Sequence, residues 1–290
     1  MQRYTTQVNH ILRKEILNDG YAPLFNEALA LSLQGGKRLR PMISLEIAHL
    51  LGKGYDIQPV AIVSELIHTA SLVIDDLPCM DNDTERRGLP TIHHKYGERR
   101  AQVVTTHLFS KAYTLLYHGF RTLEENGLDR VMDRKLLIFD TLSKNLGILG
   151  APMGQFMDTC ADPMYSTGDR QGKEQHFTDL IDKKTATLFE IAFVIGYVAG
   201  GGDLSHIESI RQCSRHFGIA FQISDDFQDT KRDANQYFCP NFVNHLGKET
   251  ALQRFNQSLE ECQQLLEQLD LHSPLFKELL AVLRSRVLNS

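Results

Sequence analysis

A run of thirteen residues, from Asp75 to Arg87, contains four aspartates, one glutamate and two arginines. Crowded carboxylates repel one another and lose hydration, so folding alone gives no reason to gather them. Their oxygens suit hard cations such as Mg²⁺, which keeps several waters and bridges carboxylates to substrate phosphates. Guanidinium groups bind phosphate oxygens through paired charge-assisted hydrogen bonds. The run therefore indicates a metal–phosphate site, and the alternative is an acidic, solvated turn that carries its own counter-ions.

A second acidic cluster, from Asp225 to Asp229, ends an apolar segment that is compatible with a helix. Asp225 and Asp229 are four residues apart, so on a helix both carboxylates project from one face. Like charges at this spacing destabilise a helix unless a cation lies between them. We therefore expect two helices, far apart in the sequence, to present carboxylates to shared metal ions.

The composition limits the class of protein. A chain of 290 residues can bury a large core, as one domain or as two closely packed ones. Its 42% hydrophobic and 23% charged residues are ordinary for a soluble globular protein. The net charge of −5 argues against a general nucleic-acid-binding protein, whose basic surface should dominate. Local basic clusters can still bind an anionic small molecule.

The cysteines and the N-terminal residues bear on location. The cysteines are odd in number and show no CxxC spacing, which favours reduced thiols over disulfides or a zinc site. They are Cys79, Cys160, Cys213, Cys239 and Cys262. The first 20 residues are too polar for a signal peptide, and no apolar run of 18 residues could span a membrane. We expect a soluble, cytoplasmic protein without a membrane span.

Almost every segment of the chain carries a helical pattern. Apolar residues recur at three- and four-residue steps, and glycine or proline interrupts the pattern between segments. The expected helices cover about 3–18, 22–34, 42–51, 60–80, 98–124, 131–145 and 177–199, then from 204 into the second acidic cluster, with two amphipathic helices after 247. The segment 160–176 is expected to be an exposed loop that could act as a lid, and 232–247 a looser segment. No alternating strand pattern persists, so we predict one all-α domain over residues 1–290.

Several motifs occur in the order and spacing of the trans-prenyl diphosphate synthases. They are GGKRLRP from Gly35, IHTASL from Ile67, DDLPCMDND from Asp75, RRG from Arg86 and FQISDDFQD from Phe221. Residues 155–158 and Lys184-Thr185 also resemble the GQxxD and KT elements of that family. The seven-residue form of the first aspartate motif is similar to the bacterial-type farnesyl and type II geranylgeranyl synthases.

The resemblance covers about residues 30–250 and implies the all-helical isoprenoid synthase fold, a helical bundle around a central cavity and usually a homodimer. The implied reaction is the head-to-tail condensation of isopentenyl diphosphate with an allylic diphosphate, which depends on Mg²⁺. An allylic C–O bond ionises readily only if the charge of the departing diphosphate is stabilised.

The resemblance also implies a role for each motif residue. Asp75 and Asp81 from one helix, with Asp225 from the other, would hold Mg²⁺ ions, about three in each active site. Asp76 and Asp229 would act through water or as supports of these ligands. The allylic diphosphate would be bound by Arg86, Lys184 and Lys248, and the isopentenyl diphosphate by Lys37, Arg40, His68 and Arg87. Thr185 and Gln222 would lie near the developing carbocation. The leaving diphosphate would take the final proton, so no protein base is named.

The sequence departs from the family pattern at Thr84-Glu85, at Thr105-Thr106 and after Asp229. The family often has a lysine after the second cluster that contacts the allylic diphosphate; residues 229–234 offer no clear equivalent, and Lys231 is the candidate for it. These changes leave the metal ligands intact and bear on catalytic strength and substrate range.

Two other functions stay open. One is a class I terpene cyclase, against which the second anion site counts, because a cyclase has no second diphosphate to bind. The other is a catalytically weak regulatory subunit of a prenyl synthase, against which the intact aspartates of both clusters count.

The residues before Asp75 bear on product length. Ala70 and Ser71 lie about one helical turn before Asp75, along the direction in which the growing chain should extend. A bulky aromatic residue at position 70 would close the pocket, whereas alanine leaves it open. We expect geranylgeranyl diphosphate as the product, with farnesyl diphosphate next. Phe109 or Tyr113 could close the opposite wall, and the donor (dimethylallyl, geranyl or farnesyl diphosphate) stays open.

Overall fold

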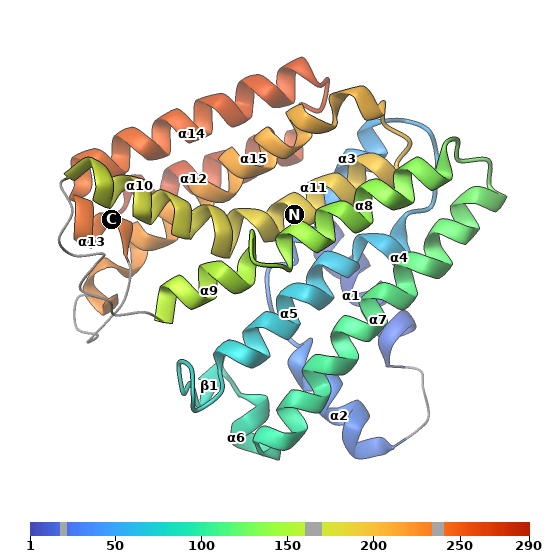
Figure 1. Cartoon of the computed structure of the whole chain (residues 1–290), viewed down its shortest axis with the longest axis horizontal. Coiled ribbons are helices and arrows are strands. Elements are labelled where there is room, and N and C mark those ends of the chain that lie inside the picture. Colours follow the sequence, from blue (N-terminus) through green and yellow to red (C-terminus); the bar gives the residue numbers. More distant parts are fainter. Residues whose placement is uncertain (18–21, 160–169, 234–240) are drawn as a thin grey trace. The chain divides into compact units, whose positions relative to one another are not determined.

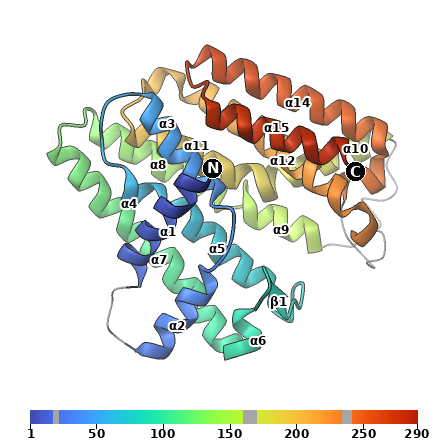
Figure 2. The ribbon, with the colours of Figure 1, turned by 180° about the vertical axis from the view of Figure 1, so that it is seen from behind.

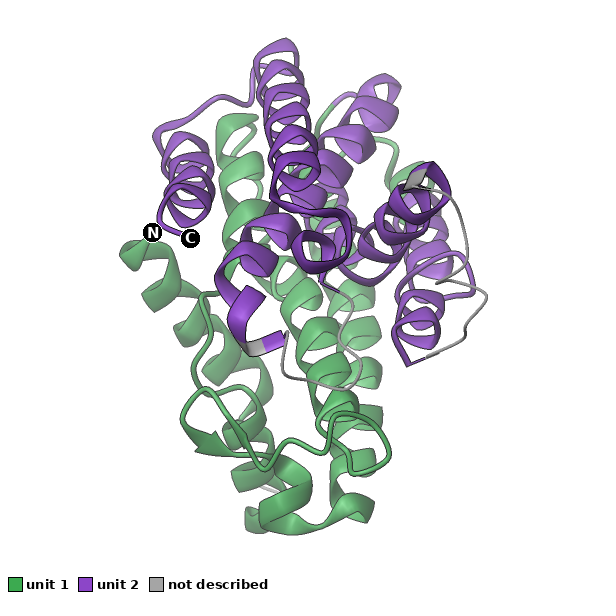
Figure 3. Ribbon diagram, turned by 90° about the vertical axis from the view of Figure 1, so that its left-hand side faces the viewer, with its two compact units in different colours: residues 1–135, 195–202 green, residues 136–194, 203–290 purple. Residues whose placement is uncertain are grey.

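The computed structural model describes residues 1–17, 22–159, 170–233 and 241–290, and these residues are mainly helical, with almost no strand (Figure 1). The all-α prediction is confirmed. Contacts divide the chain into two compact units, which Figure 3 colours separately. Unit 1 comprises residues 1–135 and 195–202, and unit 2 comprises residues 136–194 and 203–290. The expectation of a single domain stays a prediction.

Unit 1 is built around the pairing of two helices, α5 and α7, whose apolar faces pack along each other. A Cβ on Gly119 of α7 would lie 2.3 Å from a methyl carbon of Val60, so glycine permits the close approach of α4. The elements are α1 (Gln2–Ile16), α2 (Pro23–Ser32), α3 (Leu39–Leu50), α4 (Gln58–Ala61), α5 (Val63–Asp75), β1 (Glu85–Arg86), β2 (Leu89–Pro90), α6 (Ile92–Tyr96) and α7 (Glu98–Glu125).

Residues 195–202 also belong to unit 1, and Arg134 fixes them there. Its buried guanidinium donates to the main-chain oxygens of Val198 at 3.0 Å and Gly202 at 2.9 Å. The same guanidinium pairs with Asp129 at 2.7 Å. Charged hydrogen bonds of this kind satisfy carbonyl groups that the end of a helix leaves without partners.

Unit 2 is organised around the long helix α12, against which α14 and α15 pack (Figures 1 and 2). Aromatic rings fill its core: the Phe189 and Phe217 centroids lie 5.0 Å apart, and those of Phe193 and Phe276 6.0 Å apart. The elements are α8 (Val131–Asn145), which begins in unit 1, α9 (Ala151–Thr159), α10 (Arg170–Ile181), the π-helix η2 (Asp182–Ala186), α11 (Thr187–Ala199), which ends in unit 1, the 3₁₀-helix η3 (Leu204–His206), α12 (Ile207–Asp233), α13 (Phe242–Leu246), α14 (Lys248–Gln268) and α15 (Pro274–Leu288).

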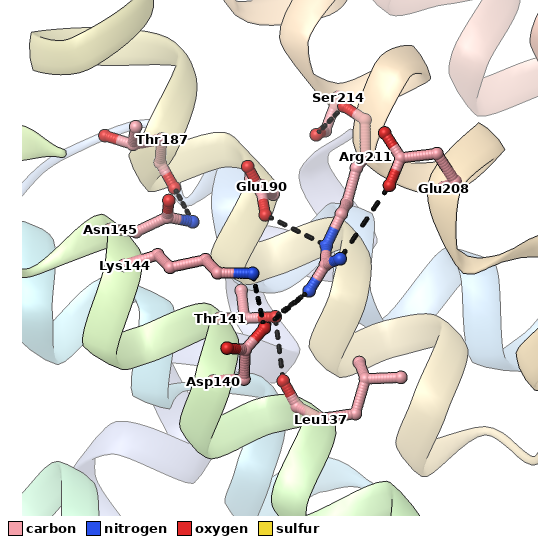
Figure 4. A network of polar contacts seen from close by, with 10 residues as sticks. All are labelled: Leu137, Asp140, Thr141, Lys144, Asn145, Thr187, Glu190, Glu208, Arg211 and Ser214. Carbon is pink, nitrogen blue, oxygen red and sulfur yellow. Dashed lines mark hydrogen bonds and ion pairs between the residues drawn. The ribbon is translucent and has the colours of Figure 1, made fainter. Parts of the chain in front are cut away.

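A polar network ties α8, α11 and α12 together in unit 2 (Figure 4). The Arg211 guanidinium lies at its centre, 3.2 Å from Asp140 and 3.4 Å from Glu190. Burial raises the pKa of Glu190, and the charge of Arg211 opposes that shift. Lys144 and Arg211 lower the pKa of Asp140, with the Lys144 hydrogen bond as the larger cause. The network therefore places the exposed Asp140 and the half-buried Glu190 beside cations that compensate their charge.

The structure corrects three element predictions. Helix α5 ends at Asp75 rather than near Met80, because Pro78 cannot continue a helix and restricts the residue before it. Residues 170–176 are helical in α10, while 160–169 of the expected loop lie outside the described residues. Helix α13 lies within the segment that was expected to be loose. Asn241 caps it, because its side chain accepts hydrogen bonds from the main-chain N–H groups of Val243 and Asn244.

Two further observations concern the expected location. Among the helices of the described ranges, none combines the length and the hydropathy that crossing a membrane requires. The described cysteines, Cys79, Cys213 and Cys262, are free, while Cys160 and Cys239 lie outside the described residues. The cytoplasmic location stays a prediction.

Candidate active site

The first acidic cluster lies at the end of α5 in unit 1. Asp75 is the last helical residue, and the chain then turns back so that the N–H of Asp81 donates to the Asp75 carbonyl at 2.9 Å. The expectation that both residues come from one helix is therefore wrong, since Asp81 lies in the turn after Pro78. The turn nevertheless keeps Asp81 beside the helix end, where two carboxylates can face the same solvent region.

Asp76 and Arg86 form an ion pair within this cluster. The Arg86 Nε lies 2.5 Å from Asp76 Oδ1, and its Nη2 lies 3.2 Å from Asp83. The short β1–β2 hairpin returns Arg86 to the end of α5. Asp76 is buried, and burial raises its pKa while Arg86 lowers it. The predicted role of Asp76 as a support of the metal ligands and the predicted contact of Arg86 with a diphosphate both stay predictions.

A basic cluster surrounds His68 on α5. Burial lowers the pKa of His68 well below its usual value, and the positive charges of Arg40, Arg87, Arg86 and Arg38 lower it further. His68 is therefore neutral near pH 7, and among the described residues its Nδ1 has no hydrogen-bond partner. Lys37 is exposed and directly precedes Arg38. The structure brings His68, Arg40 and Arg87, three of the four residues predicted for isopentenyl diphosphate, into one neighbourhood.

Arg87 lies directly on the Gly35-Gly36 backbone. A Cβ placed on Gly36 would be 2.6 Å from Nη1 of Arg87, and one on Gly35 would be 3.3 Å from its Cδ. Both glycines have positive φ angles, +75° and +86°, which other residues adopt at a cost. The two glycines therefore set the position of the Arg87 guanidinium.

The sequence reasoning missed Arg38, which anchors the same segment. Its Nη1 lies 2.6 Å from Glu65 Oε1 on α5, and both side chains are buried. Its Nε also donates to Asn9 at 2.9 Å. A buried guanidinium needs such a partner, and the basic run from Lys37 to Arg40 was the visible signal. The pair holds the basic segment against the helix that carries the aspartates.

The second acidic cluster lies on α12 in unit 2. Asp225 and Asp229 occupy successive turns, and both are partly exposed. The cation that two such carboxylates require is present: Arg286 of α15 lies with its Nη1 2.5 Å from Asp225 Oδ1. Arg286 was not predicted from the sequence, because no local pattern connects residues 61 positions apart.

Thr185 and Gln222 are adjacent, as expected of residues that serve one reacting centre. The Thr185 hydroxyl and Gln222 Oε1 are 2.8 Å apart, and Gln222 Nε2 donates to Asp226 at 2.8 Å. The N–H of Phe242 donates to the other Asp226 oxygen at 2.9 Å. Burial raises the pKa of Asp226 to about 7. The π-helix η2 carries Thr185, and single π-turns of this kind are frequent at functional sites.

The two predicted lysines of unit 2 differ in their surroundings. Lys184, also in η2, forms an ion pair with Asp158 of α9. Gly154 allows the close approach of α9 and η2, because a Cβ there would lie 2.3 Å from the main-chain nitrogen of Lys184. Lys248 is exposed, and its Nζ donates to the Ser290 carbonyl at 3.3 Å. Its role at a diphosphate stays a prediction.

The residues predicted to set product length lie on α5 and α7. Ala70 is completely buried, and Ser71 donates to the His68 carbonyl at 2.9 Å. Phe109 is partly buried, whereas Tyr113 keeps 44% of its surface exposed. A side chain that points so far into solvent is poorly placed to close an internal pocket.

The carboxylates fit Mg²⁺ in pairs. No three His, Cys, Asp or Glu side chains of the described ranges are grouped closely enough to hold a metal ion. Mg²⁺ usually takes one or two carboxylates together with substrate phosphates rather than an all-protein cage. Asp75 with Asp81, and Asp225 with Asp229, supply oxygen pairs of that kind. The metal itself and the number of ions stay predictions.

Comparisons with known proteins decide the family. Residues 22–238 match the family model described as polyprenyl synthetase. The chain belongs to the polyprenyl synthetase family. The resemblance to trans-prenyl diphosphate synthases is confirmed. The expected class of enzyme, a short-chain trans-prenyltransferase, is supported by the relatives that follow.

The chain is 32% identical over 246 residues to the mitochondrial geranylgeranyl pyrophosphate synthase 6 of Arabidopsis thaliana, covering 81% of this chain and 71% of the relative. It is 33% identical over 205 residues to a chloroplastic geranylgeranyl pyrophosphate synthase of Catharanthus roseus, covering 70% of this chain and 54% of the relative. It therefore spans only about half the length of some plant relatives. Among solved structures, an FPP/GFPP synthase from Zymomonas mobilis matches with a TM-score of 0.77 at 26% identity, over 99% of this chain and 96% of that chain.

Proposed function

We propose that this protein is a Mg²⁺-dependent prenyltransferase that condenses isopentenyl diphosphate head to tail with an allylic diphosphate. The observation that supports the proposal most directly is the pair of clusters in unit 1. Arg86 contacts the acidic cluster through Asp76, and its charge also acts on His68 in the basic cluster. Carboxylates for a metal-bound diphosphate and cations for a second, metal-free diphosphate are therefore neighbours.

The basic cluster binds the isopentenyl diphosphate. Arg40 and Arg87 supply guanidinium donors, and the neutral imidazole of His68 can donate a hydrogen bond without adding a further charge. Each charged hydrogen bond contributes about 1.5–3 kcal/mol. Several are therefore needed to hold a diphosphate against the competition of water.

The reaction breaks the allylic C–O bond, and diphosphate leaves with the electron pair. The double bond of isopentenyl diphosphate then forms the new C–C bond, and the proton lost from that unit passes to the diphosphate. Mg²⁺, when bound, stabilises the charge of the leaving diphosphate. In unit 1, Asp75 and Asp81 are the residues that would hold Mg²⁺, with Asp76 as a support, and in unit 2 they are Asp225 and Asp229.

The hydrogen-bond chain in unit 2 supports the proposed role of Thr185 beside the developing carbocation. The Asp226 carboxylate accepts from the Phe242 N–H and from the Gln222 amide, so Gln222 presents its carbonyl oxygen to Thr185. Thr185 must then donate its hydrogen to Gln222. Its oxygen lone pairs remain for the carbocation, where a fixed dipole stabilises positive charge.

Turnover by the purified protein alone tests the proposed function. The protein is incubated with labelled isopentenyl diphosphate and with dimethylallyl, geranyl or farnesyl diphosphate, with and without Mg²⁺. We expect chain elongation only with both substrates and Mg²⁺, and its loss in Asp75→Asn and in Asp225→Asn. A terpene cyclase would consume the allylic diphosphate alone, and a regulatory subunit would show no turnover without a partner. Either result would refute the proposal.

The proposed product is geranylgeranyl diphosphate, because Ala70 adds no bulk beside the predicted path of the chain. Ala70→Tyr should shorten the product to farnesyl diphosphate, as measured by chromatography of the labelled products. Since Ala70 is completely buried, the larger side chain also displaces neighbours, and thermal unfolding of the variant provides the control. Identical product lengths in the two proteins would remove Ala70 as the determinant.

The proposed assembly is a homodimer and the proposed location is the cytoplasm. Both follow from the resemblance and from the reduced-thiol pattern of the sequence. Light scattering of the purified protein tests the first, and fractionation of cells tests the second. A monomer, or recovery with organelles as the names of the plant relatives would suggest, would refute the respective proposal.

A further inference from the structure

Arg286, near the end of α15, is paired with a carboxylate that the proposed function assigns to Mg²⁺. Its Nη1 lies 2.5 Å from Asp225 Oδ1 and 3.4 Å from the Ser224 hydroxyl. The Arg286 side chain keeps only 10% of its surface exposed, and that of Asp225 keeps 32%. The pair is therefore better shielded from water than the surface ion pairs that contribute little to stability.

This pairing and metal binding exclude each other at the same oxygen. A Mg²⁺ ligand lies about 2.0–2.1 Å from the ion in a strict octahedral arrangement. A guanidinium that touches the same Asp225 oxygen would occupy part of that coordination sphere and would repel the cation. Binding of Mg²⁺ through that oxygen therefore requires Arg286 to move away from Asp225.

Arg286 also has a contact that is independent of Asp225. Its guanidinium carbon lies 5.5 Å from the centroid of the Phe221 ring, one helical turn before Asp225 on α12. Cations within about 6 Å of an aromatic face are attracted by the ring. Because this contact does not involve Asp225, the guanidinium can keep it after the ion pair is broken.

We propose that Arg286 is a displaceable counter-ion of the second acidic cluster, which competes with Mg²⁺ for Asp225 and sets the Mg²⁺ concentration at which the cluster is occupied. The inference rests on the proposed function, because it takes Asp225 as a metal ligand. It adds a residue of the C-terminal helix, outside every motif in the sequence, to the control of metal binding.

The test measures metal binding rather than turnover. Thermal unfolding and calorimetry follow the titration of the full chain with Mg²⁺ in the presence of inorganic diphosphate. Arg286→Gln removes the competing charge and should lower the half-saturating Mg²⁺ concentration about tenfold, the scale of one charged hydrogen bond. The variant should also unfold at a lower temperature without Mg²⁺, because Asp225 then lacks this partner.

Arg284→Gln is the matched control, because Arg284 is exposed on the same helix and carries the same charge. It should leave the Mg²⁺ titration unchanged. Arg286→Lys keeps the positive charge but not the planar guanidinium, so it should shift the titration in the same direction by a smaller factor. This variant keeps the test decisive if Arg286→Gln does not fold.

Three results would overturn the inference, and they differ in what else they imply. If the wild type binds diphosphate with Mg²⁺ while the Arg286 variants bind Mg²⁺ no more tightly, Arg286 does not compete with the metal. Weaker binding by those variants would instead make Arg286 a ligand of the diphosphate. If no protein in the series binds diphosphate in a Mg²⁺-dependent way, the inference and the proposed function both fail.

Discussion

Substitution of Gly36 by alanine should weaken the binding of isopentenyl diphosphate by moving Arg87. The added Cβ would lie 2.6 Å from Nη1, 2.8 Å from Cζ and 3.0 Å from Nη2 of Arg87. Favourable contacts between heavy atoms lie at about 3.5–4.0 Å. The guanidinium must therefore shift by about 1 Å, which a flexible side chain can do without unfolding the protein.

The structure separates two costs of this substitution. The φ angle of +86° at Gly36 strains any other residue by about 1–2 kcal/mol, and this cost falls on stability. The displaced guanidinium loses one charged hydrogen bond to the diphosphate, a loss of about 1.5–3 kcal/mol. At about 1.4 kcal/mol for each factor of ten, the KM for isopentenyl diphosphate should rise about 10- to 100-fold.

Gly52→Ala provides the matched control. Gly52 also has a positive φ angle, +65°, but a Cβ there would meet no atom within 4 Å. Both variants should therefore lose similar thermal stability, while only Gly36→Ala should change the kinetics. Steady-state assays with each substrate varied in turn measure the two KM values, and the KM for the allylic donor should stay unchanged in Gly36→Ala.

Two results would refute this reasoning. If Gly36→Ala and Gly52→Ala bind isopentenyl diphosphate equally well, the position of Arg87 does not govern that site. If Gly36→Ala raises both KM values by the same factor, the substitution has disturbed the unit as a whole.

Three further predictions concern other contacts. Thr185→Val removes the hydroxyl beside Gln222 and should lower kcat about tenfold or more at an unchanged melting temperature; a wild-type kcat would contradict the proposed role. Arg38→Met leaves Glu65 buried without its cation and should lower the free energy of unfolding by about 3–5 kcal/mol in denaturant titrations, whereas a loss below about 1 kcal/mol would show that Glu65 finds another partner. Burial raises the pKa of Glu190 above 4.5, so its contribution to stability is complete below about pH 4.5 and is lost as the pH rises through the raised value. Unfolding titrations from about pH 4 to about pH 8 should therefore show the wild type losing stability relative to Glu190→Gln, and parallel curves would refute this.

Helical periodicity and the acidic clusters were visible in the sequence because both are local patterns. Helix α7 spans Glu98–Glu125 against an expected 98–124, and α8 was predicted with its observed bounds. The β1–β2 hairpin has only two residues in each strand, too few for an alternating pattern to appear. The end of α5 was misplaced because the apolar run continues past the point where Pro78 stops the helix.

The candidate site was predictable in its motif residues but not in the residues that position them. Thr185 and Gln222 were expected to serve one centre, and they are adjacent. Arg38 and Arg286 could not be assigned partners, because Glu65 and Asp225 lie 27 and 61 positions away in the sequence. Such pairs depend on how helices pack, and a single sequence contains no periodic signal for an ion pair between helices.

The course of the chain through its two units has a consequence for biosynthesis. Arg134 donates to main-chain oxygens that follow it by 64 and 68 residues, and the stretch 195–202 that contains them completes unit 1. A ribosome emits the N-terminal half first, so in a nascent chain that ends at Lys135 the Arg134 guanidinium has its partner Asp129 but lacks the carbonyl acceptors of Val198 and Gly202. Unit 1 can therefore reach its final structure only after residues 136–194 of unit 2 have been translated. A fragment that ends at Lys135 should not persist as a folded species.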